Sequence, residues 1–130
     1  MIKISHLDHL VLTVADFDAT TEFYQNILGM NPVSFMSGGG ERQALEFGSQ
    51  KINLHLAGHE FASRAAHPLP GSADLCLICE NTPTDVIAHL EQHGITVEEG
   101  PVERTGARGK INSVYIRDPD GNLIEISSYQ

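Results

Sequence analysis

The chain has 130 residues, of which 41% are hydrophobic and 19% charged, a balance typical of one globular domain that can bury its own core. Its net charge of -9 argues against nucleic acids and anionic membranes as partners, since both attract concentrated Lys and Arg. Residues 1–10 lack the pattern of a signal peptide, and no stretch approaches the roughly 20 apolar residues of a membrane span. We therefore expect a cytoplasmic protein whose partner is a small molecule.

The first half of the chain predicts one helix and four strands. Residues 7–14 form an apolar run whose side chains would alternate between the two faces of a strand. A helix is expected next, because Asp16 or Asp18 can cap its start and Gly29 stands where a left-handed C-terminal cap belongs. Three further strands, separated by glycine-containing turns, are predicted at 31–37, 42–47 and 51–57.

The second half predicts the same order of elements. After a strand at 73–79, Thr82 is placed to cap a helix that has Pro83 at its first position and ends at Gly94. An Asp-Pro-Asp-Gly turn at 118–121 joins the last two strands. The three strands after the helix are predicted at 95–98, 111–116 and 122–128.

An internal repeat relates the two halves. A shift of 65 residues lays 9–14 over 74–79 and 28–30 over 93–95, whereas a shift of 70 pairs 53–56 with 123–126. We therefore predict a duplicated βαβββ module within a single domain. A linker at 58–71, whose prolines preclude a continuous helix, would join a first module at 5–57 to a second at 72–130.

Four residues with metal-binding side chains stand at matching places in the two modules: His9 and Asp74 on the first strands, His55 and Glu125 on the last. The apolar residues beside them would face the helix, so all four side chains are expected on the opposite face of their strands. A carboxylate flanked by isoleucines, as Glu125 is, is costly to bury unless it is paired or bound to metal. The pattern therefore predicts a metal site.

We expect His9, His55 and Glu125 to bind a divalent ion, and Asp74 either to bind it or to orient a histidine. Mixed imidazole and carboxylate ligands suit Mn, Fe, Co, Ni or Zn better than Ca or Mg. The alternative for each histidine taken alone is an ordinary core or surface residue. The repeat favours the metal site over that alternative.

Two other groups of residues invite a functional interpretation. The segment 104–110 concentrates cations, and Arg104 and Arg108 could hold a carboxylate through bidentate contacts; a solvated loop is the alternative. Cys76 and Cys79 lie three apart in a predicted strand and would point to opposite faces, so they cannot share a metal ion or readily form a disulfide. We expect both cysteines to be buried apolar residues.

The motifs at 7–14, 23–24, 28–29 and 118–126 resemble those of the vicinal oxygen chelate superfamily, which includes glyoxalase I, extradiol dioxygenases and bleomycin-binding proteins. Within it, the segments 53–55, 65–72 and 99–106 resemble a branch of glyoxalase domain-containing or virulence-associated proteins. The resemblance implies two paired βαβββ modules in an α+β fold, with eight strands in a curved mixed sheet around a metal-binding cavity. It also implies a homodimer, and its ligand pattern falls on His9, His55, Asp74 and Glu125.

Asp74 bears on the chemistry that the resemblance implies. Glyoxalase I and the dioxygenases usually have a histidine at this place, and a dioxygenase needs two histidines and one carboxylate. The resemblance then favours a glyoxalase-like lyase or isomerase on a small oxygenated, anionic substrate, with Glu125 as the base. Tyr115, ten residues before Glu125, is a candidate hydrogen-bond donor to a bound oxygen, and a packing role is the favoured alternative. Two alternatives stay open: an Fe or Mn extradiol-type dioxygenase, and a non-enzymatic small-molecule binding or resistance protein.

Overall fold

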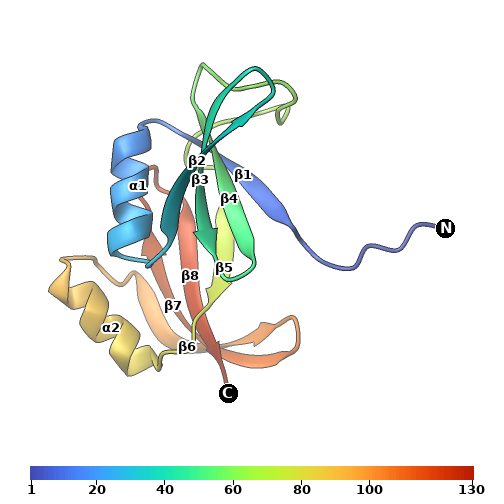
Figure 1. Cartoon of the computed structure of the whole chain (residues 1–130). Helices are drawn as coiled ribbons and strands as arrows, with labels where there is room; N and C mark the ends of the chain where they lie inside the picture. The colour runs from blue at the N-terminus through green and yellow to red at the C-terminus, as the bar shows by residue number, and fades with distance from the viewer. The chain divides into compact units, whose positions relative to one another are not determined.

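The computed structural model describes all 130 residues, which divide into two compact units, 1–70 and 71–130. Each unit contains four strands and one helix in the order β-α-β-β-β (Figure 1). The predicted α+β fold of two βαβββ modules is therefore confirmed. The eight strands form two four-stranded mixed sheets, one in each unit, and neither sheet closes into a barrel. At ten residues each, the two helices are too short to cross a membrane.

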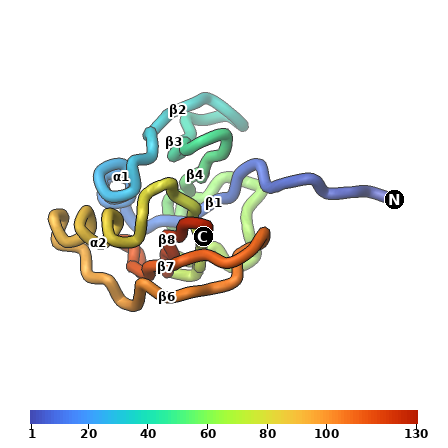
Figure 2. Tube along the Cα trace, turned by 90° about the horizontal axis from the view of Figure 1, so that it is seen from below, coloured from blue at the N-terminus to red at the C-terminus, as the bar shows by residue number.

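Unit 1 is built on a sheet with the strand order β1-β4-β3-β2. The parallel pair β1 and β4 lies at one side, and β3 joins β4 to β2 through antiparallel pairs. Figure 2 labels these four strands along the chain trace. Its elements are β1 (His9–Val14), α1 (Phe17–Asn26), β2 (Asn31–Ser37), β3 (Gly40–Phe47) and β4 (Gln50–Leu56).

The helix of unit 1 starts and ends where the sequence predicts. Asp16 is the N-cap, and its carboxylate accepts a hydrogen bond from the Asp18 backbone N–H at 2.9 Å. Gly29 has a φ of 69°, the left-handed conformation that glycine adopts at little cost. Tyr24 of α1 is fully buried, and the helix contacts β2 and β3. The packing leaves the other face of this sheet without a helix from its own unit.

Unit 2 repeats this topology with the strand order β5-β8-β7-β6. Thr82 caps its helix by accepting a hydrogen bond from the Asp85 backbone N–H at 3.2 Å, and Pro83 opens the helix as expected. The helix contacts β7 and β8. The elements are β5 (Asp74–Ile78), α2 (Pro83–Gln92), β6 (Glu99–Gly106), β7 (Gly109–Arg117) and β8 (Leu123–Tyr129).

The prediction of a strand at 95–98 is wrong, because β6 starts at Glu99. Glycine and proline usually disfavour strands, so Gly100 and Pro101 argue against a strand in the sequence. Because β6 is an edge strand, proline, which lacks a backbone N–H, can be accommodated there without breaking a hydrogen bond between strands. A register shift between Glu99 and Val102 accommodates them. The predicted basic loop at 104–110 is consequently a hairpin, with Arg104 in β6 and Lys110 in β7.

The turn before β8 holds that strand in place. Asp118 accepts hydrogen bonds at 2.9 Å from the backbone N–H groups of Asp120 and Asn122. The Asn122 side chain donates to Asp118 at 2.8 Å and accepts from the Ala73 backbone N–H at 2.8 Å. Since Ala73 immediately precedes β5, this buried network ties the starts of β5 and β8 together. The predicted turn is confirmed.

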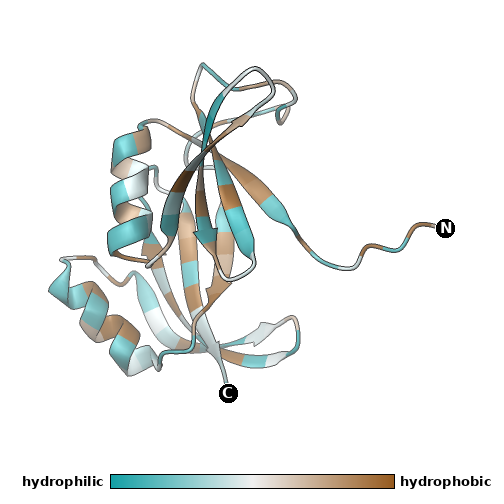
Figure 3. Cartoon of the chain, in the orientation of Figure 1, coloured by the Kyte–Doolittle hydropathy of each residue, from teal (hydrophilic) through white to brown (hydrophobic).

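The two faces of each sheet differ in polarity. Along β1, Leu12 and Val14 are buried, and in β8 the buried Ile124 and Ile126 alternate with polar residues. Figure 3 shows this alternation of hydrophobic and hydrophilic residues along the strands and around both helices. The apolar side chains pack toward the helix of their unit. The polar side chains are therefore left for chemistry on the opposite face.

Candidate functional site

Unit 2 gathers four of the predicted site residues around one pocket. In the parallel pair of β5 and β8, Asp74 is beside Leu123 and Cys76 is beside Glu125, so all four side chains share a face. A pocket of about 320 Å³ is lined by both carboxylates together with Arg104 and Tyr115. Asp74 and Glu125 therefore lie on one face of the sheet, as the alternation along their strands predicts.

Two buried serines hold the Glu125 carboxylate. The Ser113 hydroxyl donates to Glu125 Oε2 at 2.6 Å, and the Ser127 hydroxyl lies 3.4 Å from the same oxygen. The two hydroxyl oxygens are 2.7 Å apart, and both serines are at most 1% exposed. Such a network fixes the rotation of the carboxylate. Ser113 was not predicted from the sequence, although Ser127, which lies opposite it, stands two residues after Glu125 and so on the same face.

Tyr115 lies opposite Glu125 in the β7–β8 ladder. Arg104 Nε donates a hydrogen bond to the Tyr115 hydroxyl oxygen at 3.0 Å. Burial raises the pKa of Tyr115, and the smaller opposing effect of Arg104 does not reverse the rise. The phenol therefore remains protonated at neutral pH and can donate a hydrogen bond into the pocket.

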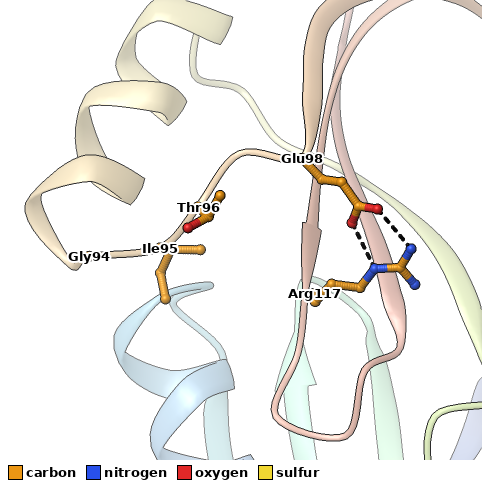
Figure 4. Close-up of a pocket in the computed structure, with 5 residues that line it drawn as sticks. All are labelled: Gly94, Ile95, Thr96, Glu98 and Arg117. Carbon is orange, nitrogen blue, oxygen red and sulfur yellow. Dashed lines mark hydrogen bonds and ion pairs between the residues drawn. The ribbon is translucent and has the colours of Figure 1, made fainter.

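The cations near this pocket are already paired with acids. Arg104 contacts Glu99 at 3.2 Å, and Arg117 makes two hydrogen bonds to Glu98 at 2.7 and 3.0 Å. Figure 4 shows the second pair at the edge of another pocket, of about 410 Å³, beside the end of α2. Arg108 lies at the hairpin turn, outside the lining of either pocket, with its guanidinium 5.1 Å from the ring centre of Tyr129.

Cys76 departs from the expectation of burial. It is exposed, on the same face as Glu125, and its sulfur lies 3.3 Å from the Ser127 hydroxyl. The prediction of a buried residue is wrong, because β5 is an edge strand and Cys76 faces away from the apolar side of the sheet. Cys79 is half-buried, and both thiols are free.

In unit 1, His9 is held by its neighbour. Its Nδ1 lies 2.7 Å from a carboxylate oxygen of Asp8, and the side chain is 42% exposed. A carboxylate that is hydrogen-bonded to Nδ1 orients the imidazole ring and leaves Nε2 available to bind a metal ion. Val11 is paired with Asn53 in the β1–β4 ladder, so Asn53 lies on the same face as His9 and two residues further along. The side-chain oxygen of Asn53 is buried without a hydrogen-bond partner.

The ladder registers correct the alignment of the two modules. His9 pairs with Lys51 in unit 1, and its counterpart Asp74 pairs with Leu123 in unit 2. Lys51 and Leu123 are therefore equivalent residues, and the last strands of the two modules align with a shift of 72 residues. The residue equivalent to Glu125 is then Asn53. The predicted shift of 70, which matched His55 to Glu125, is wrong, because alternation along a strand defines a face but not the register.

His55 pairs with Thr13 and is four residues further along the ladder than His9. The two imidazoles are therefore separated by about 13 Å along the strands, too far for both to bind one ion. His55 is only 4% exposed, and burial, followed by the charge of Arg42, lowers its pKa. It contacts the Phe61 ring, with ring centres 5.9 Å apart, and lines a pocket of its own unit.

Each unit contains side chains of kinds that bind divalent transition metals. The structure contains no group of three or more His, Cys, Asp or Glu side chains that could hold a metal ion. Unit 1 has one imidazole nitrogen of His9 and the Asn53 oxygen, and unit 2 has the carboxylates of Asp74 and Glu125. A buried acceptor without a donor is costly, and a bound cation would satisfy it. Nitrogen and oxygen donors are the kinds that the ions expected from the sequence bind.

Comparison with known proteins connects this geometry to a family. Residues 6–126 match the family model described as Glyoxalase/Bleomycin resistance protein/Dioxygenase superfamily. The chain is 56% identical over 126 residues to virulence protein STM3117 of Salmonella typhimurium, which covers 97% of this chain and 85% of that protein. The crystal structure of that protein matches with a TM-score of 0.94 at 54% identity, covering 99% of this chain and 100% of that one.

Two further relatives extend the comparison. Glyoxalase domain-containing protein RDO1 of Mycosarcoma maydis is 56% identical over 129 residues, covering 99% of this chain and 71% of that protein. The crystal structure of lactoylglutathione lyase from Agrobacterium tumefaciens matches with a TM-score of 0.72 at 25% identity and covers 97% of this chain and 95% of that one.

Proposed function

We propose, for a chain that belongs to the glyoxalase/bleomycin resistance protein/dioxygenase superfamily, a metal-dependent lyase or isomerase activity on a small oxygenated, anionic substrate. The reaction would move a proton between neighbouring carbon atoms of an α-hydroxycarbonyl compound. The likeness to a protein named lactoylglutathione lyase supports this class of chemistry. The observation that carries the proposal is the Glu125 carboxylate, held by Ser113 in one pocket with Asp74 and Tyr115.

The proposed metal ligands are His9, Asp74 and Glu125. Asn53 replaces His55 as the fourth proposed ligand, because Asn53 is the residue equivalent to Glu125. Its side-chain oxygen is buried and has no hydrogen-bond partner. When bound, a Ni, Co, Zn, Mn or Fe ion would polarise the substrate oxygens and make the adjacent C–H group more acidic. Asp8 would keep Nε2 of His9 available as a ligand.

Glu125 is the proposed base. Its carboxylate would take the proton from one substrate carbon and return it to the next, so the substrate isomerises with no net loss of a proton. Ser113 would keep the carboxylate in one orientation throughout, since its hydroxyl stays on Oε2. The protonated Tyr115 would donate a hydrogen bond to the substrate oxygen that gains negative charge.

Asp74 favours this reaction over ring cleavage by an extradiol dioxygenase. A dioxygenase site needs two histidines and one carboxylate on its metal, and the second histidine would stand where Asp74 stands. The non-enzymatic alternative differs from both in having no turnover. Oxygen uptake with catechols and ferrous ion would identify a dioxygenase instead.

Proton exchange in D₂O tests the proposal. The protein is stripped of metal, reloaded separately with Ni, Co, Zn, Mn and Fe(II), and mixed with α-hydroxycarbonyl compounds with and without an anionic group. We expect loss of the C–H signal by NMR with at least one metal, and a rate lowered on the order of 10²-fold or more in Glu125→Gln. Glu91→Gln, on the exposed side of α2, is the matched control. The proposal would be refuted if none of the five metal ions supported proton exchange, or if the exchange rate were unchanged in Glu125→Gln.

We also propose that the protein acts in the cytoplasm as a homodimer, the assembly that the family resemblance implies. Light scattering after size exclusion measures the assembly directly, since one chain has a mass of 14.2 kDa. A mass of a single chain over the working range of concentrations would contradict the dimer.

A further inference from the structure

We propose that a pocket in unit 1, lined by His55, Arg64, Thr13 and Ser63, binds the anionic group of the small-molecule substrate, a carboxylate or a phosphate. The description of that molecule as a substrate rests on the proposed function. Binding of the anion itself does not, because the pocket lies in unit 1 and needs none of the proposed metal ligands.

The pocket has a volume of about 400 Å³ and is formed by β1, β4 and the segment that follows β4. Thr13 and His55 are neighbours in the β1–β4 ladder, so a hydroxyl and an imidazole enter the pocket from the same face of the sheet. Ser63 and Arg64 add a second hydroxyl and a guanidinium from the following segment. A few converging polar groups in a concave space are typical of small-ligand sites.

Arg64 differs in its pairing from three of the four cations of unit 2. Arg104, Lys110 and Arg117 all form ion pairs with acids of their own unit. Arg64 forms no ion pair within unit 1, and the nearby Glu60 accepts a hydrogen bond from the Gly58 backbone N–H. A guanidinium with no acid of its own can bind a carboxylate or phosphate through two parallel hydrogen bonds.

His55 supplies a donor in the lining of the pocket. Its ring is 4% exposed and is packed against Phe61, which is itself covered by the Arg42 guanidinium at 3.9 Å. A neutral imidazole has one N–H to donate, and the Thr13 hydroxyl can donate another hydrogen bond beside it.

The position of His55 along β4 relates the anion pocket to the proposed chemistry. His55 is two residues beyond Asn53 on the same face, a separation of about 7 Å. A substrate that places oxygens near Asn53 and an anionic group near His55 would therefore carry its charge several bonds from the carbonyl. This spacing suggests an α-hydroxycarbonyl compound with a carboxylate or phosphate at its far end.

Titration of the metal-free protein tests the pocket without turnover. The probes are propionate and inorganic phosphate, with propionamide as the uncharged counterpart of propionate, and the signals followed are the His55 imidazole resonances. We expect both anions, but not the amide, to shift those resonances in a saturable manner. Arg64→Gln should weaken anion binding on the order of tenfold, the loss expected for a charge-assisted hydrogen bond.

Arg108→Gln is the matched control, because it removes an exposed cation that the sequence pattern alone makes a candidate for the same role. Equal weakening by the two substitutions, weakening by Arg108→Gln only, or equal binding of propionate and propionamide would overturn the proposal. Preference between the two anions identifies the substrate class. Anion binding that persists while no metal supports proton exchange would refute the proposed function and leave the anion pocket intact.

Discussion

The two units share a topology and differ in the chemistry of their polar faces. At two equivalent places, unit 2 has the carboxylates of Asp74 and Glu125, whereas unit 1 has His9 and the neutral side chain of Asn53. One step further along the last strand, unit 2 has Ser127, which contacts Glu125, and unit 1 has His55. The two units thus have the same strand order and differ in the side chains at these places.

This difference suggests that the two modules supply different chemical groups to the proposed reaction. Unit 2 provides negative charge and a protonated phenol, the groups needed to hold a cation and to move a proton. Unit 1 provides an oriented imidazole and, through Arg64, a cation without an acid partner in its unit. Changes at Glu125, Ser113 and His55 make one unit resemble the other or remove what distinguishes it, whereas changes at the helix caps remove a feature that both units share.

The largest effect is expected when unit 2 is made to resemble unit 1. Glu125→Gln places a carboxamide where unit 1 has Asn53, and it removes the base. We expect kcat for the isomerase reaction to fall on the order of 10² to 10⁴-fold, the usual contribution of a general base. The rate is measured with saturating metal. A loss of less than tenfold would show that Glu125 is not the base.

A smaller decrease in kcat is expected when Glu125 keeps its charge but loses its hydrogen bond from Ser113. Ser113→Ala removes the 2.6 Å hydrogen bond to Oε2, and we expect kcat to fall about tenfold with little change in KM. Ser128→Ala on the same strand as Ser127 is the control, because Ser128 points to the other face of β8. An effect on KM alone would assign Ser113 to substrate binding.

Acid should destabilise unit 1 through His55. Its pKa is lowered from 6.5 in the folded chain, so below that value the unfolded chain binds a proton more readily than the folded one. The contribution of neutral His55 to the free energy of unfolding is therefore fully present above about pH 6.5, and it is lost as the pH falls toward the pKa of His55 in the folded chain. Chemical denaturation of the metal-free protein between about pH 7 and pH 5 should show a smaller loss in His55→Gln than in wild type. His67→Gln, which alters an exposed histidine, should retain the wild-type dependence.

The smallest effects are expected at the helix caps, where the units are most alike. Asp16→Ala and Thr82→Ala each remove a cap and should each lower the free energy of unfolding by about 1 kcal/mol. Urea titration followed by circular dichroism measures both. A cap variant with unchanged stability would mean that this helix end has another source of support.

The fold was largely predictable because its signals are local. The caps at Asp16 and Thr82, the turn at 118–121 and the alternation in the last strands are each determined by a few adjacent residues. The strand β6 was misplaced because Gly100 and Pro101 are tolerated only by its position at the sheet edge. That position is a property of the whole sheet.

The site was predictable only in part, for a related reason. Alternation along each strand identified the face of His9, Asp74 and Glu125, but the register between strands is set by turns and by packing. A difference of two residues keeps the face and changes the neighbour, which is why Asn53, and not His55, is the counterpart of Glu125. Ser113 was missed because a serine in a strand has no pattern of its own.

Metal binding by the purified protein tests the central claim most directly. Calorimetric titration of metal-free protein with Ni, Co, Zn and Mn should show one site per chain for at least one ion, weakened on the order of 10-fold or more in His9→Gln and in Glu125→Gln. His55→Gln should bind the ion as wild type does. Absence of binding, or binding lost in His55→Gln and kept in Glu125→Gln, would contradict the assignment of this site.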